Sequence, residues 1–483
     1  MSSFASLGIA AKGLVAAQRA MEITGQNISN INTEGYSRQR VEQTEAVVSP
    51  NGRFGVKNAS GQGVEITGIT RITDTFVNAT ARQDQATAAQ LTQSDQVWNQ
   101  VETNLGEPGT QSLSARMTAN WNAWSALGSA TGATAVASAK ASVVATSGAV
   151  AEKLKSLDSA VAQQWGGLTD QAGAVTKQAN ELVGQIGELN LAILQVKNSG
   201  ASPNEIMDQR DLKVAQLTKL TGARVTDRPD GMVDLYVGNA SVLSGTNAKA
   251  MSVTTSDTSP AAAAAMSGFD KAKAGYTTWA VKVDGMTVQP DSGQLRGVLD
   301  GINVTLPGVG NQYDQAAVTL KNQVNAVYGT ANGGAAGDFY SFTQTAGAPA
   351  TAQGAAQGAA ASLKVVPTSA TLADSSDAGS VSRDVAAKVG VLGEATDGPS
   401  VAWRGTVVSI ASAAQSADLR STLADDVASR SAARRESVSG VNLDEEMTNL
   451  VSYQHAYAGA ARVLTAMDQA LETLIRGTGR VGL

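Results

Sequence analysis

The two ends of this chain carry apolar residues in heptad spacing, which constrains the fold more than any other feature of the sequence. From residue 4 onward, alternating steps of three and four place a row of mainly apolar side chains on one helical stripe. We expect this row to form the seam of a coiled coil. Its apolar members are Phe4, Leu7, Ala11, Leu14, Met21 and Ile28.

The last forty residues repeat this pattern over a longer distance. Asn442 is a good N-cap, and the acidic residues 444–446 suit a first helical turn because the helix dipole favours negative charge there. At 1.5 Å per residue the helix extends for about 50 Å, too far for a small globule to cover. Its expected seam contains Leu443, Met447, Leu450, Tyr457, Leu464 and Leu471.

Both terminal helices carry a second seven-residue repeat on another face. Pairing the two helices with each other is the economical arrangement, and the second faces are then left for lateral self-assembly. Because these helices have little core of their own, we expect them to be largely disordered in the free monomer. The lateral rows are Ile9, Ala16 and Ile23 in the first helix, and Ser452, Gly459 and Ala466 in the last.

Between the ends, helical patterns alternate with β-prone stretches, which we expect at 41–72 and 224–290. Residues 331–397 are rich in Gly, Ala, Ser and Asp and predict a small β-rich insertion. The expected fold class is mainly α with β-rich insertions in discontinuous, nested domains. These are a terminal coiled-coil assembly domain (1–40 plus 440–483), a mainly helical middle domain (41–330 plus 398–439) and a small outer β domain (331–397).

Composition excludes several classes of function. Lys and Arg total 36 against 42 Asp and Glu, and a net charge of −6 argues against a nucleic-acid or anionic-membrane partner. With no cysteine and a single histidine, His455, we expect no metal and no cofactor. No apolar run approaches the roughly 18 residues of a membrane helix. The first residues also lack the basic leader of a cleavable signal.

No group of residues assembles into a catalytic site. No glycine-rich phosphate loop opens a helix, and a Ser-His-Asp triad has only His455 available, on the polar edge of the last helix. Asp208 and Asp211 are a possible carboxylate pair. They lie beside Arg210 in a helical pattern, which favours ion pairing on a helix surface. We therefore expect that the protein is not an enzyme.

The run from Asn27 to Gln39 closely resembles the N-terminal signature of bacterial flagellar rod, hook and hook-associated proteins. Glu34 stands where that family commonly has proline. The signature residues here are Asn27, Asn30, Asn32, Thr33, Gly35 and Tyr36. Further segments resemble the FlgK family of hook-associated proteins in particular: Leu105–Pro108 with Asn120–Trp124, Asp208–Leu212, and Ser439–Glu446 with Tyr453 and Tyr457.

This resemblance implies a structural protein of the bacterial flagellum at the junction between hook and filament. It implies paired terminal helices that line a hollow axial tube, a helical middle domain and an outer β-rich insertion. The implied partners are other copies of the chain in a ring, the hook protein, a second hook–filament junction protein and an export chaperone on the C-terminal helix. Export would use the flagellar type III apparatus and place the protein outside the cell.

Two alternatives remain open from the sequence. A rod or hook axial subunit carries the same N-terminal signature, although the Trp-containing helical segment and the Asp-Gln-Arg-Asp motif favour a junction protein. A secreted hydrolase carried on an axial scaffold would have its site in 224–397, where no catalytic constellation supports it.

Overall fold

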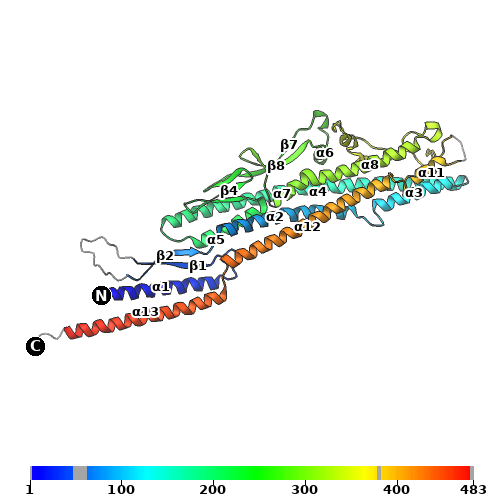
Figure 1. The fold of residues 1–483 in the computed structure, drawn as a ribbon. Coiled ribbons are helices and arrows are strands. Elements are labelled where there is room, and N and C mark those ends of the chain that lie inside the picture. Colours follow the sequence, from blue (N-terminus) through cyan, green and yellow to red (C-terminus); the bar gives the residue numbers. More distant parts are fainter. Residues whose placement is uncertain (1–2, 47–61, 378–381, 479–483) are drawn as a thin grey trace.

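The first and last helices of the chain lie side by side (Figure 1). The computed structural model describes residues 3–46, 62–377 and 382–478. Helix α1 (Ser3–Ser29) runs toward the body of the molecule, and α13 (Leu443–Thr478) runs back from it. The pair is therefore antiparallel, and both termini lie at the same end. The expected pairing of the terminal helices is confirmed.

A β-hairpin follows α1 and lies beside it. Strand β1 (Gln39–Glu45) pairs antiparallel with β2 (Val64–Arg71), and a register shift between Glu42 and Gln43 marks a bulge. These strands account for the expected β segment at 41–72, of which residues 47–61 lie outside the described part of the chain.

Long helices form the body. Helix α2 (Thr75–Leu105) packs along α12 (Pro399–Ser439). Helix α4 (Ala133–Asn198) has 66 residues and so extends for about 100 Å. Helix α8 (Leu306–Tyr328) packs against α4. The other helices are α3 (Leu113–Ser129), α5 (Asn204–Thr221), α6 (Gly268–Lys273), α7 (Gln294–Asp300), α9 (Ala352–Ala356), α10 (Ala359–Ser362) and α11 (Asp384–Val391), with a π-helical turn η2 (Gly301–Thr305) and 3₁₀ turns η1 (Ala261–Ala263) and η3 (Ala331–Gly334).

Local sequence explains where these helices begin and end. Asp74 caps α2, because its side chain accepts hydrogen bonds from the backbone N–H groups of Phe76 (2.9 Å) and Val77 (3.0 Å). Helices α2 and α5 end at Gly106 and Gly222, whose φ angles of 64° and 67° are left-handed. Glycine adopts this conformation without steric cost, so both stops are encoded in the sequence.

Two small antiparallel sheets occupy the expected β region at 224–290. The first sheet has the order β3-β4-β5-β6, and the second has the order β7-β8-β9. Asn190 of α4 fixes the first sheet, donating to the carbonyl oxygens of Val233 (2.9 Å) and Gly245 (2.6 Å). The strands are β3 (Arg224–Asp227), β4 (Val233–Val237), β5 (Ala240–Ser244), β6 (Asn247–Ala248), β7 (Met251–Asp257), β8 (Thr277–Val283) and β9 (Met286–Val288).

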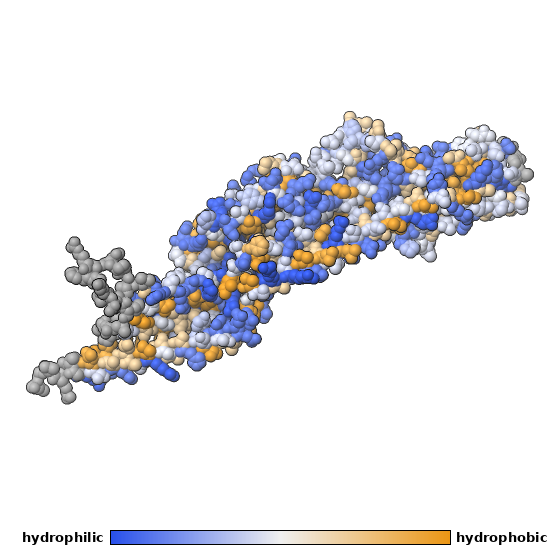
Figure 2. Space-filling view, viewed as in Figure 1, coloured by the Kyte–Doolittle hydropathy of each residue, from blue (hydrophilic) through white to orange (hydrophobic). Residues whose placement is uncertain are grey.

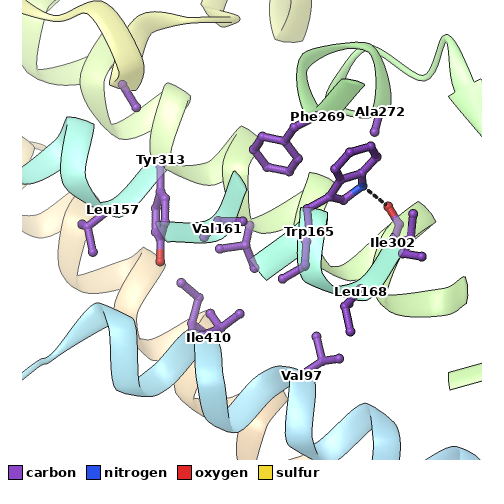
Figure 3. Packing of buried hydrophobic residues seen from close by; sticks show 14 of the residues in the cluster. Val97, Leu157, Val161, Trp165, Leu168, Phe269, Ala272, Ile302, Tyr313 and Ile410 are labelled. Carbon is purple, nitrogen blue, oxygen red and sulfur yellow. Dashed lines mark hydrogen bonds between the residues drawn. The ribbon is translucent and has the colours of Figure 1, made fainter. Parts of the chain in front are cut away.

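One hydrophobic cluster runs through the body. Figure 3 shows its centre, where Trp165 of α4 packs against Phe269 of α6 and donates from Nε1 to the Ile302 carbonyl oxygen at 3.0 Å. Helices α2 and α12 reach the same cluster through Val97 and Ile410. The small sheets and the long helices thus share one core.

The segment 331–397 differs from its expected character. Within its described residues, strands β10 (Tyr340–Ser341) and β11 (Lys364–Val365) have two residues each, and short helices provide most of the regular structure. Phe339 packs against Trp124 of α3 with ring centroids 5.0 Å apart. The expectation of a β-rich segment is therefore wrong. Alanine-rich stretches here form short helices, and the segment joins the main core instead of enclosing its own.

A buried cluster of charges, centred on one lysine, connects four helices. The Nζ of Lys273, in α6, lies 3.1 Å from Asp158 of α4 and 3.0 Å from Asp314 of α8. Asp314 also accepts from the Ala360 N–H of α10 at 2.9 Å. Burial opposes the charged lysine, but the surrounding carboxylates outweigh it and raise the pKa of Lys273.

Substitution of Lys273 by methionine should strongly destabilise the body. It leaves Asp158 and Asp314 buried without a counter-charge, which costs about 3–5 kcal/mol. Urea unfolding would measure the loss. The control is Lys271→Met, which removes the more exposed pair with Asp257 and should cost less than about 1 kcal/mol. Equal effects of the two variants would contradict this role for the buried cluster.

Candidate functional site at the joint of the terminal helices

Asn27 is the centre of a hydrogen-bonded joint at the base of the terminal helices. Its side chain is buried and bonds both backbone groups of Gln39, donating to the carbonyl oxygen at 2.9 Å and accepting from the N–H at 3.0 Å. The same amide donates to Glu446 of α13 at 3.1 Å and accepts from the Tyr36 hydroxyl at 2.9 Å. One side chain therefore connects α1, β1 and α13.

Arg38 completes the connection to the start of α13. Its guanidinium donates to Glu446 at 2.7 Å and to Glu445 at 2.6 Å, and its backbone N–H donates to the Ser439 carbonyl oxygen at 2.9 Å. The Glu446 side chain is only 2% exposed, so the charge of this carboxylate must be compensated locally. Arg38 and Asn27 supply that compensation, and they fix the first turn of α13 in place.

A second carboxylate group ties the joint to the body. Asp208 of α5 accepts from the Ser37 N–H at 3.1 Å and from Arg71 of β2 at 2.8 Å, and Arg71 also donates to Asp211 at 2.9 Å. Arg210 binds Asp211 at 2.8 Å. The expectation of ion pairing on a helix surface is corrected, because Asp208 and Arg210 are only 5% and 2% exposed.

Burial and charge act in opposite directions on these two carboxyl groups. Burial raises the pKa of Asp208, although Arg71 and the Ser37 N–H favour its charged form. At Asp211 burial is again the largest effect, but Arg210 and Arg71 together outweigh it and hold the pKa below its usual range. Asp211 is therefore the carboxylate that the arginines stabilise best.

The loop after α1 brings the remaining signature residues into position. Asn30 caps the end of the helix, since its side chain donates to the Gln26 carbonyl oxygen at 3.0 Å and accepts from the Thr33 hydroxyl at 3.1 Å. Gly35 has a φ of 81°, and a Cβ there would lie 3.2 Å from the Cβ of Leu212. Asn32 is exposed. The N-terminal signature and the Asp208–Leu212 motif thus meet at one place.

In α1, the buried row precedes the expected seam by one position. Ala20 and Thr24 line a cavity shared with Glu446 and Tyr453 of α13. Small side chains let two helices approach closely, which explains why alanines occupy this contact. The buried row is Ala10, Ala17, Ala20, Thr24 and Asn27, whereas Leu7, Leu14, Met21 and Ile28 are half-buried, Ala11 is exposed and the Phe4 side chain lies outside the described residues.

The expected lateral row of α1 packs within the chain. A Cβ at Gly63, just before β2, would lie 3.4 Å from the Cα of Ile9. Ile23 lines a cavity together with Val41 of β1, and Ala16 is buried as well. The expectation of a free lateral face is corrected here, because the β1–β2 hairpin lies against this row.

In α13, the least exposed residues also follow steps of three, four and seven. Leu450, Leu464 and Leu471 of the expected seam belong to this row. Leu443 and Met447 are 47% exposed and Tyr457 is 37% exposed. The expected lateral residues Ser452, Gly459 and Ala466 are exposed. The row of lower exposure is Glu446, Asn449, Leu450, Tyr453, Ala460, Ala461, Leu464, Met467 and Leu471.

The described ranges hold no arrangement that resembles a metal or membrane site. No group of three or more His, Cys, Asp or Glu residues there could hold a metal ion. His455 is exposed on α13. No helix within those ranges combines the length and apolar character that crossing a bilayer requires. The joint is built from the hydrogen bonds and ion pairs of Asn27, Arg38 and Glu446.

Three segments of the chain, which contain these motifs, match known families of flagellar proteins. Residues 98–340, about half of the chain, match the family described as "Flagellar hook-associated protein FlgK helical domain". The chain belongs to the FlgK family. The termini match flagellar rod families, "Flagella basal body rod protein" over 7–36 and "Flagellar basal body rod FlgEFG protein C-terminal" over 435–477.

Known FlgK relatives agree with this membership. Flagellar hook-associated protein 1 of Bacillus subtilis is 26% identical over 99% of each chain. The protein of the same name from Escherichia coli is 26% identical over 70% of this chain, which spans 60% of that relative's length. A solved structure, the flagellar hook junction protein FlgK from Burkholderia pseudomallei, shares the fold with a TM-score of 0.56 at 15% identity, covering 76% of this chain and 100% of that one.

The FlgK match decides between the structural alternatives. A rod or hook subunit would share the terminal matches, but the middle of this chain matches the FlgK helical domain. The protein is therefore a structural component of the flagellar hook–filament junction. Sequence reasoning missed Arg38, Gln39, Arg71 and Glu446 as parts of the joint, although Arg38, Gln39 and Glu446 lie within the motifs that it identified.

Substitution of Asn27 by alanine should loosen the joint. It leaves the Gln39 backbone groups and the Tyr36 hydroxyl without a partner, for an expected local loss of about 2–4 kcal/mol. Hydrogen exchange of the β1 amides and of the α1 amides next to Asn27 would measure it. The control, Asn30→Ala, removes bonds only at the exposed end of α1 and should cost less than about 1 kcal/mol. Wild-type exchange rates in Asn27→Ala would contradict the central role of this residue.

Tyr36 should make the joint sensitive to alkali. Burial, helped by Asp208, Glu205 and Glu446, raises the pKa of Tyr36 to about 12. An unfolded tyrosine ionises near pH 10. The contribution of Tyr36 to the free energy of unfolding is therefore complete below about pH 10 and is lost as the pH rises toward 12.

Accordingly, the difference in unfolding free energy between wild type and Tyr36→Phe should shrink as the pH rises from about 10 to 12. Urea titrations at several pH values would measure this difference, with Tyr457→Phe as the control for loss of a phenol. If phenolate absorbance shows Tyr36 ionising near pH 10 in the folded protein, the expected alkaline sensitivity is contradicted.

Proposed function

We propose that this protein builds the hook–filament junction by packing its terminal helix pair against neighbouring copies, while the joint holds that pair to the body. The observation that carries the proposal is a row of apolar residues on each terminal helix that is half-buried in α1 and exposed in α13. These rows contain Leu7, Leu14, Met21 and Ile28 in α1, and Leu443, Met447 and Val451 in α13. Figure 2 shows hydrophobic residues gathered over this end of the molecule.

The two uncovered rows turn to the same side of the pair. In each helix the uncovered row follows the packed row by one residue, a rotation of about 100° in the same sense along the chain. Because α1 and α13 run in opposite directions, equal rotations point both rows to one face. The β1–β2 hairpin lies on the other side, against Ile9. The apolar residues of both rows are thereby available to another subunit on the same face.

The exposure of the apolar residues on this face supports an intermolecular role. Leu443, Met447 and Val451 are each 47% exposed. Large apolar side chains grouped in a row on a surface usually mark an interaction site. In our proposal, residues 1–40 and 440–483 form the assembly domain, and the expected seam residues act between subunits as well as within one.

The finer assignments extend this proposal. We assign the neighbouring copies to a ring, the hook protein to one end of that ring, and a second hook–filament junction protein to the other. Before assembly, an export chaperone would cover the apolar residues of α13, and the chain would leave through the flagellar type III apparatus. We further propose that the terminal helices, beyond the joint formed by Asn27, Arg38 and Glu446, are largely disordered until neighbours supply the missing burial.

Substitution of Met447 by aspartate should block assembly without unfolding the protein. Met447 lies on the uncovered face, so a charge there leaves the packed row intact but prevents apolar contact with a neighbour. Cells with this variant should make hooks without filaments and release flagellin, as seen by electron microscopy and in the medium. Leu464→Asp, in the packed row, should give the same phenotype.

The matched control is His455→Asp, which places the same charge on an exposed polar position of α13. Cells with this control should carry normal filaments. Circular dichroism of the purified Met447→Asp protein should match the wild type. Normal filament attachment in Met447→Asp cells would overturn the proposed assembly face.

A further inference from the structure

A small pocket beside the joint contains two arginines for which the described part of the chain supplies no hydrogen-bond or ion-pair partner. It lies where α2, α5, α12 and the signature loop meet, and it has a volume of about 20 Å³. This is enough space for one small group. Its polar lining includes Ser37, Asn78, Arg82, Gln85, Asp211 and Arg435.

The two arginines are Arg82 of α2 and Arg435 of α12. Over residues 3–46, 62–377 and 382–478, no side chain or backbone group accepts a hydrogen bond from either guanidinium. Both side chains are half-buried, so water cannot solvate them as fully as it does an exposed arginine. Unpaired guanidinium groups at such a depth are uncommon, because charged groups that leave water are usually paired.

The neighbouring carboxylates are already engaged. Asp208 binds Arg71, and Asp211 binds both Arg71 and Arg210. Burial lowers the pKa of Arg82, and the nearby Arg435 and Arg210 act in the same direction, whereas Asp211 and the exposed Asp227 oppose them. Among the residues that line the pocket, Arg82 and Arg435 face one carboxylate, Asp211, which is already paired, so the pocket has a positive charge in excess.

Helix α2 directs further hydrogen-bonding groups to the same place. Asn78, Arg82 and Gln85 are spaced by four and three residues, which puts them on one face of the helix. The Oδ1 atom of Asn78 is buried without a hydrogen-bond partner. Exchanging the oxygen and nitrogen positions of this side-chain amide would present its NH₂ group to the pocket instead. The site thus offers donors and positive charge around a space for one group.

We propose that the pocket formed by Arg82, Arg435 and Asn78 binds a single carboxylate, supplied by an acidic side chain of a neighbouring copy. The planar, forked guanidinium matches a carboxylate, and the small volume excludes nucleotides and sugars. The chain has 42 acidic residues to supply the group. The source of the carboxylate rests on the proposed assembly, whereas the anion preference of the pocket does not.

The anion preference is tested on the purified full-length protein with sodium acetate as the probe. Arginine side-chain NMR signals should shift on titration with acetate, and the Arg82→Gln spectrum identifies which signal belongs to Arg82. Arg435→Gln should weaken the apparent acetate affinity by about tenfold or more. Arg430→Gln, an exposed position on the same helix, should leave it unchanged. An equal response to sodium chloride, or no response in wild type, would overturn the carboxylate assignment.

The source of the carboxylate is tested in cells. Arg82→Gln should be exported and folded, since it removes an unpaired charge, and the cells should shed filaments under shear more readily than Arg430→Gln cells. If acetate binding is lost in Arg82→Gln while filaments hold as in wild type, the assignment to a neighbouring copy is wrong. This result is separable from failure of the assembly face, because Met447→Asp tests that face without touching the pocket.

Discussion

The structure depends on the buried carboxylate of Glu446. A charge in that position is stable only if it is neutralised and fully hydrogen-bonded, and Arg38 and Asn27 together meet this requirement. Because the two partners come from the far end of the sequence, compensation of this charge brings the beginning of α13 to the end of α1. The antiparallel direction of the terminal pair follows from this contact.

The joint also explains why three separate motifs occur in one chain. The loop after α1 supplies Asn27 and Arg38, α5 supplies Asp208, and the start of α13 supplies Glu446. Each motif alone leaves buried polar groups without partners, and together they satisfy one another. Beyond the joint, α13 packs along α1 within the described residues. The molecule therefore combines a firmly held base with helices that keep exposed apolar residues, such as Leu443, Met447 and Val451, on one face.

Much of this fold could be predicted from the sequence, because heptad spacing and glycine stops are local signals. Periodicity predicts both terminal helices and their pairing, and Pro203 and Gly222 mark the start and the end of α5. The position of the packed row in α1 could not be predicted. A row that packs within the chain and a row that faces another molecule have the same period of seven, and the larger residues Leu14 and Met21 suggested the wrong one.

Long-range contacts account for the other differences. The burial of Asp208 and Arg210 depends on Arg71, more than a hundred residues earlier, so no local pattern separates it from a surface ion pair. In 331–397, short alanine-rich runs resemble neither a long helix nor a strand, and their conformation is set by packing against α4 and α8. The sequence shows the motifs that form the joint, but only the structure shows which of their residues contact one another.

Helices α1 and α13 lie together at one end of the molecule, and the rest of the chain extends away from them (Figure 1). The molecule is therefore attached at that end alone. Residues can be added to or removed from the opposite extremity while the base keeps its geometry. A protein of this design can change the length of its body over evolutionary time while the terminal helix pair and its joint stay constant.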